Sequence, residues 1–291
     1  MGIRYDIQKE LGSLCARNKD GSFATQANRA NILNQAAKVL QKAGFKNLAA
    51  TSLKPKHVDT LLSKWKADGL SAGTIKNRMA AVRWWAEKVG KQNCVPRNND
   101  VAGIERRVYV GTESKAQFLT PEALNQIGHE RLRVSLELEQ AFGLRREEAL
   151  KFQPSFADQG DRITLKGSWC KGGREREIPI TSDYQRQVLA KAASLAGKGS
   201  MIPPDKNYRE WLSTYEKATS RAGLGNLHGL RHHYAQARFE ALAEFKCPLA
   251  GGPKSDELTP EQRETDLAAR MQVSAELGHG REQVTVVYLG R

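Results

Sequence analysis

Apolar residues recur at helical spacing in three segments near the start of the chain, residues 24–44, 54–69 and 71–91. Each segment places apolar side chains three or four positions apart, which is the pattern of an amphipathic helix. A glycine ends the first two, and Ser71 or Thr74 is suited to cap the third. The apolar positions are Ile32, Leu33, Ala36, Ala37, Val39 and Leu40, then Val58, Leu61, Leu62 and Trp65, then Ile75, Met79, Val82 and Trp85.

The helical period is lost in residues 98–117, which carry Asn, Gly and Ser. A chain of 291 residues is long enough for two domains, each with its own core. We therefore expect a helical N-terminal domain over residues 1–103, a linker over 104–117 and a second domain over 118–291.

The second domain is expected to be helical around one β-hairpin. Thr120 before Pro121 is a typical helix start, and residues 133–152 continue with helical spacing. Residues 161–180 change to two short β-prone runs that meet at a glycine-containing turn. Residues 246–265 are rich in Pro, Gly and charge and look like an exposed excursion. Further helices are expected around residues 183–196, 206–221 and 229–245. The fold class is mainly α with a small β-hairpin (α+β).

Charge is spread unevenly along the chain. There are 46 Lys and Arg against 32 Asp and Glu, a net charge of +14, and residues 1–113 hold 20 against 9. Such a balance favours a polyanionic partner. The third predicted helix carries basic side chains on its outer face, which are either ordinary solvated charges or phosphate-binding groups. The excess charge makes phosphate binding the better interpretation.

Other features narrow the class of protein. No apolar run approaches the roughly 20 residues that cross a bilayer, and the first residues lack the apolar core of a signal peptide. We expect a soluble protein in the cytoplasm, with no membrane partner. The four cysteines are far apart and show no zinc-binding spacing, so they are expected to be reduced thiols.

Four stretches of the second domain place a cationic or proton-transferring residue near an expected element end. They are "GLRREE" with Arg145 and Glu148, "KGGRER" with Lys171, "HGLR" with His228 and Arg231, and "LGHGREQVTVVY" with His279 and Tyr288. Each has a simple structural explanation by itself: surface charges, a solvated hairpin lysine, a helix cap, or a packed terminal tyrosine. The adjacent histidines after Arg231 lack an HExxH arrangement or carboxylates at ligand spacing, which disfavours a metal site.

Taken in order, the four motifs resemble those of the tyrosine recombinase (phage integrase) family. That family's pattern is G-L-R-x-x-E, a hairpin lysine before G-x-x-E-R, H-x-x-R, and L-G-H with a tyrosine nine residues after the histidine. The resemblance covers residues 118–291, and residues 20–95 are a less specific match to the family's core-binding domain. It implies a clamp around DNA and site-specific recombination, of the integration or excision type, through a 3'-phosphotyrosyl intermediate.

The resemblance also implies residue roles. Tyr288 would be the nucleophile, Arg145 and Arg231 would bind the scissile phosphate, and Lys171 would protonate the leaving oxygen. His228 would act as base and acid, His279 would hydrogen-bond the phosphate, and Glu148 would orient Arg145. The residues expected to bind DNA are Lys76, Arg78, Arg83, Lys88, Arg106 and Arg107. Arg146 and Lys166 are the alternatives for the arginine and the lysine.

The expected partners are double-stranded DNA recombination sites, further copies of the chain in a tetramer on DNA, and an accessory DNA-bending or directionality factor. No cofactor and no metal are implied. The long His228-to-His279 spacing suggests an insertion over residues 246–270, and with the three residues that follow Tyr288 it favours a phage or integrative mobile element as the source. The alternatives are a type IB topoisomerase-like enzyme, a non-catalytic DNA-binding relative and a metal-dependent nuclease.

Overall fold

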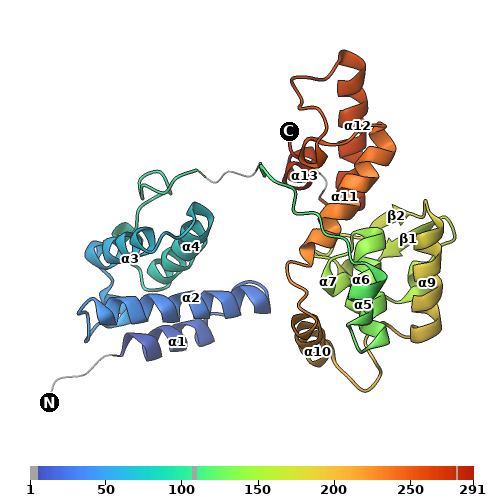
Figure 1. The fold of residues 1–291 in the computed structure, drawn as a ribbon. Coiled ribbons are helices and arrows are strands. Elements are labelled where there is room, and N and C mark those ends of the chain that lie inside the picture. The colour runs from blue at the N-terminus through green and yellow to red at the C-terminus, as the bar shows by residue number, and fades with distance from the viewer. Residues whose placement is uncertain (1–5, 107–109, 280) are drawn as a thin grey trace. The chain divides into compact units, whose positions relative to one another are not determined.

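The computed structural model describes residues 6–106, 110–279 and 281–291, without the side chain of residue 282. It divides into two compact units, Met1–Val108 and Tyr109–Arg291, each with its own hydrophobic core (Figure 1). Among the described residues, no helix combines the length and the hydropathy that a membrane crossing requires. All four cysteines are unpaired.

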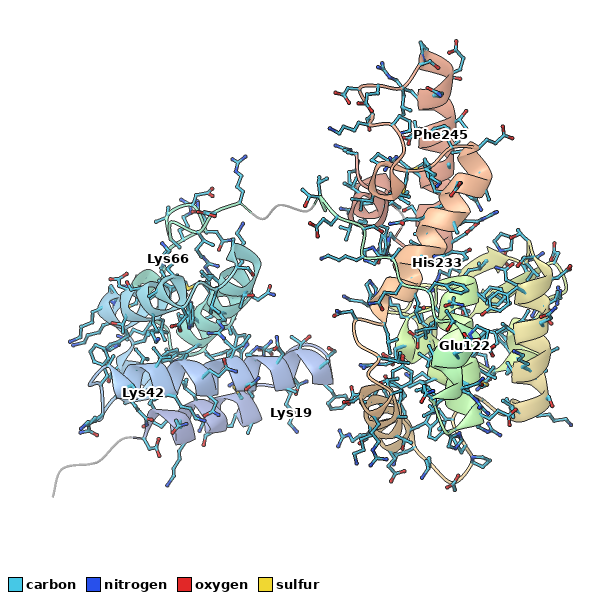
Figure 2. All side chains as sticks on the ribbon, viewed as in Figure 1. Lys19, Lys42, Lys66, Glu122, His233 and Phe245 are labelled. Carbon is cyan, nitrogen blue, oxygen red and sulfur yellow. The ribbon has the colours of Figure 1, made fainter. Side chains whose placement is uncertain are left out.

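The first unit is a bundle of helices around two buried tryptophans, Trp65 and Trp85. Its long helices are α1 (Ile7–Arg17), α2 (Phe23–Lys42), α3 (Pro55–Ala67) and α4 (Ala72–Lys88), with short 3-10 turns at Ala50–Ser52 and Gln92–Cys94. The three predicted helices are thus present, and Ser71 rather than Thr74 caps α4. Helix α1 was not predicted from the sequence. Figure 2 shows Lys19, Lys42 and Lys66 among the basic side chains of this unit.

The second unit packs helices around α6 and a two-stranded antiparallel sheet. Strand β1 (Arg162–Leu165) pairs with β2 (Arg176–Pro179), so the predicted hairpin is confirmed, although the connection is long and contains a 3-10 turn at Gly167–Trp169. The helices are α5 (Pro121–Asn125), α6 (Glu130–Phe142), α7 (Arg146–Lys151), α8 (Pro154–Ala157), α9 (Asp183–Ala196), α10 (Tyr208–Arg221), α11 (His228–Ala243), α12 (Pro260–Glu276) and α13 (Glu282–Leu289). The mainly helical fold class with a small hairpin is confirmed.

The expectation of one continuous helix over residues 133–152 was wrong. Helix α6 ends at Phe142 and is capped by Gly143, whose backbone is left-handed with φ of +60°, and Arg145 is extended before α7 begins. A Cβ on Gly143 would lie 2.5 Å from Cδ1 of Tyr234, so glycine is required both by the backbone and by this close approach. The break turns the chain and places Arg145 at the start of a helix instead of inside one.

Residues 246–265 are not wholly the exposed excursion that their composition suggested. Cys247 and Leu258 are buried, a 3-10 turn forms at Pro248–Ala250, and α12 begins already at Pro260. Thr259 caps α12 through a hydrogen bond to the backbone of Gln262, and the Gln262 side chain bonds back. This segment is therefore partly packed against the core of the second unit.

Candidate active site

Tyr288 lies on α13, which is anchored in the core of the second unit. Leu289 is fully buried and Tyr288 is 5% exposed. The backbone carbonyl of Tyr288 accepts a hydrogen bond from Gln236 Nε2 at 3.0 Å, and that of Gly290 accepts one from Arg270 Nη1 at 2.8 Å. The β-branched residues of this segment favour a helix only weakly, so packing against α11 and α12 stabilises it.

The hydroxyl of Tyr288 lies beside both residues of the H-x-x-R motif. His228 Nε2 is 3.3 Å from Tyr288 Oη, and Arg231 Nε donates to the same oxygen at 3.4 Å. These two residues are three positions apart on α11 and therefore share a helix face. The His279 ring stacks on the tyrosine, with centroids 5.5 Å apart and planes 21° apart. Four of the six predicted catalytic residues thus lie together.

Arg231 is held in place by backbone groups. The side chain is 1% exposed, donates to the carbonyls of Gly143 and Leu277, and has its Nη2 3.4 Å from His279 Nε2. Burial, and then the charge of Arg145, lowers the pKa of Arg231 to about 10. The guanidinium therefore remains protonated at neutral pH, and its orientation is fixed.

Arg145 reaches the same place from the break between α6 and α7. Its backbone N–H donates to Glu148 Oε2 at 2.7 Å and its Nη1 to Oε1 at 2.8 Å, while Nη2 donates to the carbonyl of Leu277 at 3.4 Å. Both arginines thus meet at Leu277. The alternative, Arg146, has a side chain that is 45% exposed and forms an ion pair with Glu216 at 3.0 Å, so the geometry favours Arg145.

Glu148 is fully buried and binds two arginines, whereas the sequence predicted only that it orients Arg145. Besides Arg145 it binds Arg176, whose Nη1 and Nη2 lie 3.0 and 2.6 Å from its two oxygens. Burial would raise the pKa of Glu148, but the hydrogen bonds and charges of these arginines outweigh burial and lower the pKa to about 2. Arg176 is the last residue of the K-G-x-x-E-R motif, so this motif could have identified it as a site residue from the sequence.

The histidines around Tyr288 are neutral at neutral pH. Burial, and then the charge of Arg231, lowers the pKa of His228 and lowers that of His279 to about 3. His232, which was considered from the sequence only as a possible metal ligand, also packs here, with its ring centroid 4.5 Å from that of Tyr288. Burial, and then the charge of His228, lowers the pKa of His232 to about 4. Its position directly after Arg231 gave no local sign of this contact.

The two hairpin lysines lie in different surroundings. Lys171 is exposed in the loop between β1 and β2 and, in the described part of the chain, forms no hydrogen bond or ion pair. Lys166 Nζ instead donates to Gln153 at 2.7 Å and lies 4.2 Å from the ring centroid of Phe156. The structure does not bring Lys171 into contact with Tyr288. Of the two lysines, only Lys166 has side-chain partners among the described residues.

The six residues expected to bind DNA belong to the first unit, and three of them have partners within it. Arg78 Nη2 donates to a glutamine side chain at 3.0 Å, Arg83 to the Asn99 side chain at 3.1 Å, and Lys88 pairs with Asp20 at 2.9 Å. Lys76 is half-buried and Arg106 is exposed, while Arg107 lies outside the described residues.

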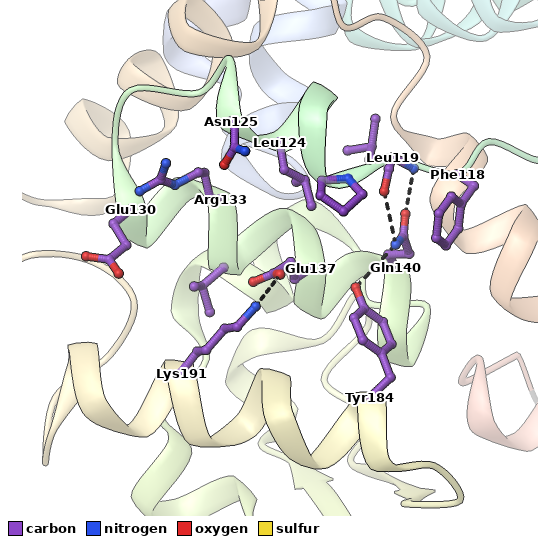
Figure 3. A pocket seen from close by; sticks show the side chains of 12 residues that line it. Phe118, Leu119, Leu124, Asn125, Glu130, Arg133, Glu137, Gln140, Tyr184 and Lys191 are labelled. Atoms are coloured by element: carbon purple, nitrogen blue, oxygen red, sulfur yellow. Dashed lines mark hydrogen bonds and ion pairs between the residues drawn. The ribbon is translucent and has the colours of Figure 1, made fainter.

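A pocket of about 680 Å³ adjoins Arg145 and His228 and continues along α10 past Tyr215 and Ser220. Another, of about 420 Å³, lies away from the site between α5, α6 and α9 (Figure 3). Its lining is internally paired, for example Lys191 with Glu137 at 2.7 Å, and it contains no predicted site residue. Within the described residues, no group of three or more His, Cys, Asp or Glu side chains is arranged to hold a metal ion.

Two protein-family models match the chain up to residue 237, and neither reaches the segment that contains His279 and Tyr288. The model described as "Phage integrase, N-terminal" matches residues 6–95, and the model described as "Integrase" matches residues 103–237. No match was found among curated protein sequences.

Three solved structures show the fold. The integrase of transposon Tn1549 in complex with circular intermediate DNA is 14% identical with a TM-score of 0.53, and the match covers 98% of this chain and 95% of that one. Lambda integrase bound to DNA is 18% identical with a TM-score of 0.52, covering 88% and 96%. The XerH recombinase bound to its difH substrate is 16% identical with a TM-score of 0.56, covering 97% and 80%. At these identities the likeness is one of fold.

Proposed function

The chain belongs to the tyrosine recombinase (phage integrase) family of site-specific DNA recombinases, and we propose that it cuts and rejoins DNA through a 3'-phosphotyrosyl intermediate on Tyr288. The observation that carries this proposal is the arrangement around one hydroxyl. His228 Nε2 and Arg231 Nε both lie within 3.4 Å of Tyr288 Oη, and Arg145 is held beside them through the shared carbonyl of Leu277.

In the cleavage step, Tyr288 Oη attacks the scissile phosphorus and the 5'-oxygen of the next nucleotide leaves. The phenol proton passes to Nε2 of His228, which can accept it because burial keeps that imidazole neutral. Arg145 and Arg231 each offer a charged, planar donor pair to the non-bridging phosphate oxygens. The bond energy is retained in the phosphotyrosine.

The leaving 5'-oxygen needs a proton, and Lys171 is proposed to supply it. The loop that carries Lys171 is exposed, and its amine has no partner among the residues that the structure describes, whereas Lys166 binds Gln153 and packs on Phe156. His279, stacked on Tyr288, is proposed to hydrogen-bond the phosphate. These side chains provide the cations and proton carriers, so the proposed reaction uses no metal or cofactor. The same groups acting in reverse let a 5'-hydroxyl attack the phosphotyrosine and reseal the strand.

We also propose the roles of the two domains, the substrate, the oligomeric state on DNA and the source of the chain. Residues 1–103 act as a core-binding domain joined through 104–117 to the catalytic residues 118–291, and the substrate is a pair of duplex recombination sites in the cytoplasm. The lambda integrase tetramer on a Holliday junction, 14% identical to this chain, supports a tetramer on DNA. The likeness to the integrase of transposon Tn1549 supports an origin in a mobile element. An accessory DNA-bending or directionality factor is proposed from the family resemblance alone.

Covalent trapping tests the proposal. The protein is incubated with nicked duplexes tiled across the DNA that flanks its gene, in the presence of a chelator, and adducts are resolved on a denaturing gel. We expect an adduct with the wild type and with the matched control Tyr184→Phe, a half-exposed tyrosine that is hydrogen-bonded to Gln140, and none with Tyr288→Phe.

Four outcomes would contradict the proposal. An adduct that survives in Tyr288→Phe places the nucleophile elsewhere, and no adduct on DNA that the protein binds in a gel shift indicates a non-catalytic relative. Cleavage that the chelator abolishes indicates a metal-dependent nuclease. An adduct that relaxes supercoils but never joins two different duplexes indicates a topoisomerase.

A further inference from the structure

Arg176 connects the hairpin to two other parts of the candidate site. It is the first residue of β2, its side chain is 5% exposed, and it binds both oxygens of Glu148. Glu148 in turn binds the backbone N–H and the guanidinium of Arg145. One buried carboxylate therefore joins a hairpin arginine to a proposed phosphate-binding arginine.

The same guanidinium also supports the turn that carries His279. Nε of Arg176 donates to the backbone carbonyl of Glu276 at 2.8 Å, at the C-terminal end of α12. The carboxylate of Glu276 is itself fixed by Tyr234 and Arg238. At the following Gly278, with φ of +68°, a Cβ would lie 3.0 Å from Cδ of Arg176.

We propose that Arg176 is a positioning residue that holds Arg145, through Glu148, and the Gly278–His279 turn, through the carbonyl of Glu276, in one reactive geometry. The inference rests on the proposed recombinase chemistry and deepens it. Arg176 does not touch the phosphate in this scheme. It acts on the two groups that do and on the strand that follows the Lys171 loop, so it ties three separate segments of the chain together.

A purely stabilising role explains these contacts less well. A buried ion pair is often no more stabilising than apolar residues of similar volume, because both charges lose their hydration. The arrangement here supplies orientation instead: the bidentate pair fixes the plane of Glu148, and that carboxylate then fixes Arg145 at two points. Loss of such positioning reduces a reaction rate far more than it reduces binding.

The first measurement compares Arg176→Gln with Arg162→Gln. Arg162 lies in β1 of the same hairpin, is half-exposed, and pairs with Glu177 across the strands, so its variant removes the same charge without touching the site. Single-turnover cleavage of a nicked duplex at saturating protein should be about a hundredfold slower in Arg176→Gln and unchanged in Arg162→Gln. The melting temperature and the affinity for DNA are measured on both.

A double-mutant cycle separates positioning from folding. If Arg176 acts through Glu148, the variant Arg176→Gln/Glu148→Gln should cleave no more slowly than Glu148→Gln alone, because residues that act as one unit have non-additive effects. Arg176→Lys should recover part of the rate, because one ammonium can replace a single contact but not the bidentate pair.

The pH profile gives an independent readout. The charged and titratable groups that face Glu148 are Arg145, Arg176, Arg231, Cys170 and Glu139. Without Arg176 the carboxyl loses the partner that offsets burial, so cleavage by Arg176→Gln should decline as the pH falls in a way that the wild type does not. The double variant, which lacks the carboxyl, should not show this additional decline.

Wild-type cleavage rates in Arg176→Gln, or additive losses in the double variant with no change in pH profile, would overturn the inference. These results are distinct from failure of the proposed function, in which the wild type itself forms no adduct at Tyr288. If Arg176→Gln does not fold, Arg176→Lys carries the same comparison.

Discussion

Replacement of Gly143 by alanine should weaken the second unit and the candidate site together. Gly143 has φ of +60°, a region that costs an alanine roughly 1–2 kcal/mol. The added Cβ would also lie 2.5 Å from Cδ1 and 2.9 Å from Cγ of Tyr234, a ring that is buried and cannot move freely.

The steric cost is large because the Tyr234 ring is buried and its hydroxyl is hydrogen-bonded to Glu276. Displacement of the ring is an overpacking strain of about 1–3 kcal/mol, and it pulls the Tyr234 hydroxyl from Glu276, a buried charged hydrogen bond worth about 1.5–3 kcal/mol. We therefore expect Gly143→Ala to lower the free energy of unfolding by about 3.5–8 kcal/mol, summing these ranges. The carbonyl of Gly143 also accepts from Arg231, so cleavage should fall as well.

A matched variant isolates the steric term. Gly223 in the same unit has φ of +68°, and a Cβ there would meet nothing within 4 Å, so Gly223→Ala should pay only the backbone cost. Urea unfolding followed by circular dichroism gives both free energies, and Gly69→Ala, at φ of +67° in the first unit, identifies which transition belongs to which unit. Equal destabilisation by Gly143→Ala and Gly223→Ala would refute the role assigned to Tyr234.

Three further predictions follow from the site. Because burial lowers the pKa of His228, kcat/KM for cleavage should be flat near neutral pH and should decline only in more acidic solution than an ordinary histidine would require. His228→Gln should lose that decline, and an unchanged profile in the variant would show that another group is the base. Burial raises the pKa of Glu139 to about 8. Protonated Glu139 stabilises the fold fully below the unfolded pKa of about 4.3, and this stabilisation is lost as the pH rises through about 8. Glu139→Gln does not titrate, so its free energy of unfolding should increase relative to that of the wild type between those pH values. A difference that stays constant across this pH range contradicts the prediction. Lys171→Ala should reduce the cleavage rate at least about a hundredfold, whereas Lys166→Ala should affect mainly the melting temperature. A substrate with a 5'-bridging phosphorothiolate has a leaving group that needs no proton. Lys171→Ala should therefore regain activity on that substrate.

Features that the sequence determined by itself are those encoded by near neighbours. Helical spacing and a serine cap located α4, the Thr120–Pro121 start located α5, and alternating β-prone runs around glycines located the hairpin. The same Thr-Pro-Glu signal stands at residues 259–261 and begins α12, so that helix was also predictable. These features follow from the sequence because a cap, a period or a turn residue acts within a few positions.

Tertiary structure decided what depends on distant partners. The ring of Tyr234, 91 positions later, leaves no room for a Cβ on Gly143 at the end of α6. Arg176 is held by Glu148 and by the backbone carbonyl of Glu276. No local pattern encodes such contacts, because each arises only when separate helices and the hairpin pack into one core. The order of the motifs could indicate which residues form the site, but only packing decided which of Arg145 and Arg146 points inward. The backbone leaves α6 through a left-handed glycine, so that Arg145 faces Leu277 and Arg146 faces Glu216.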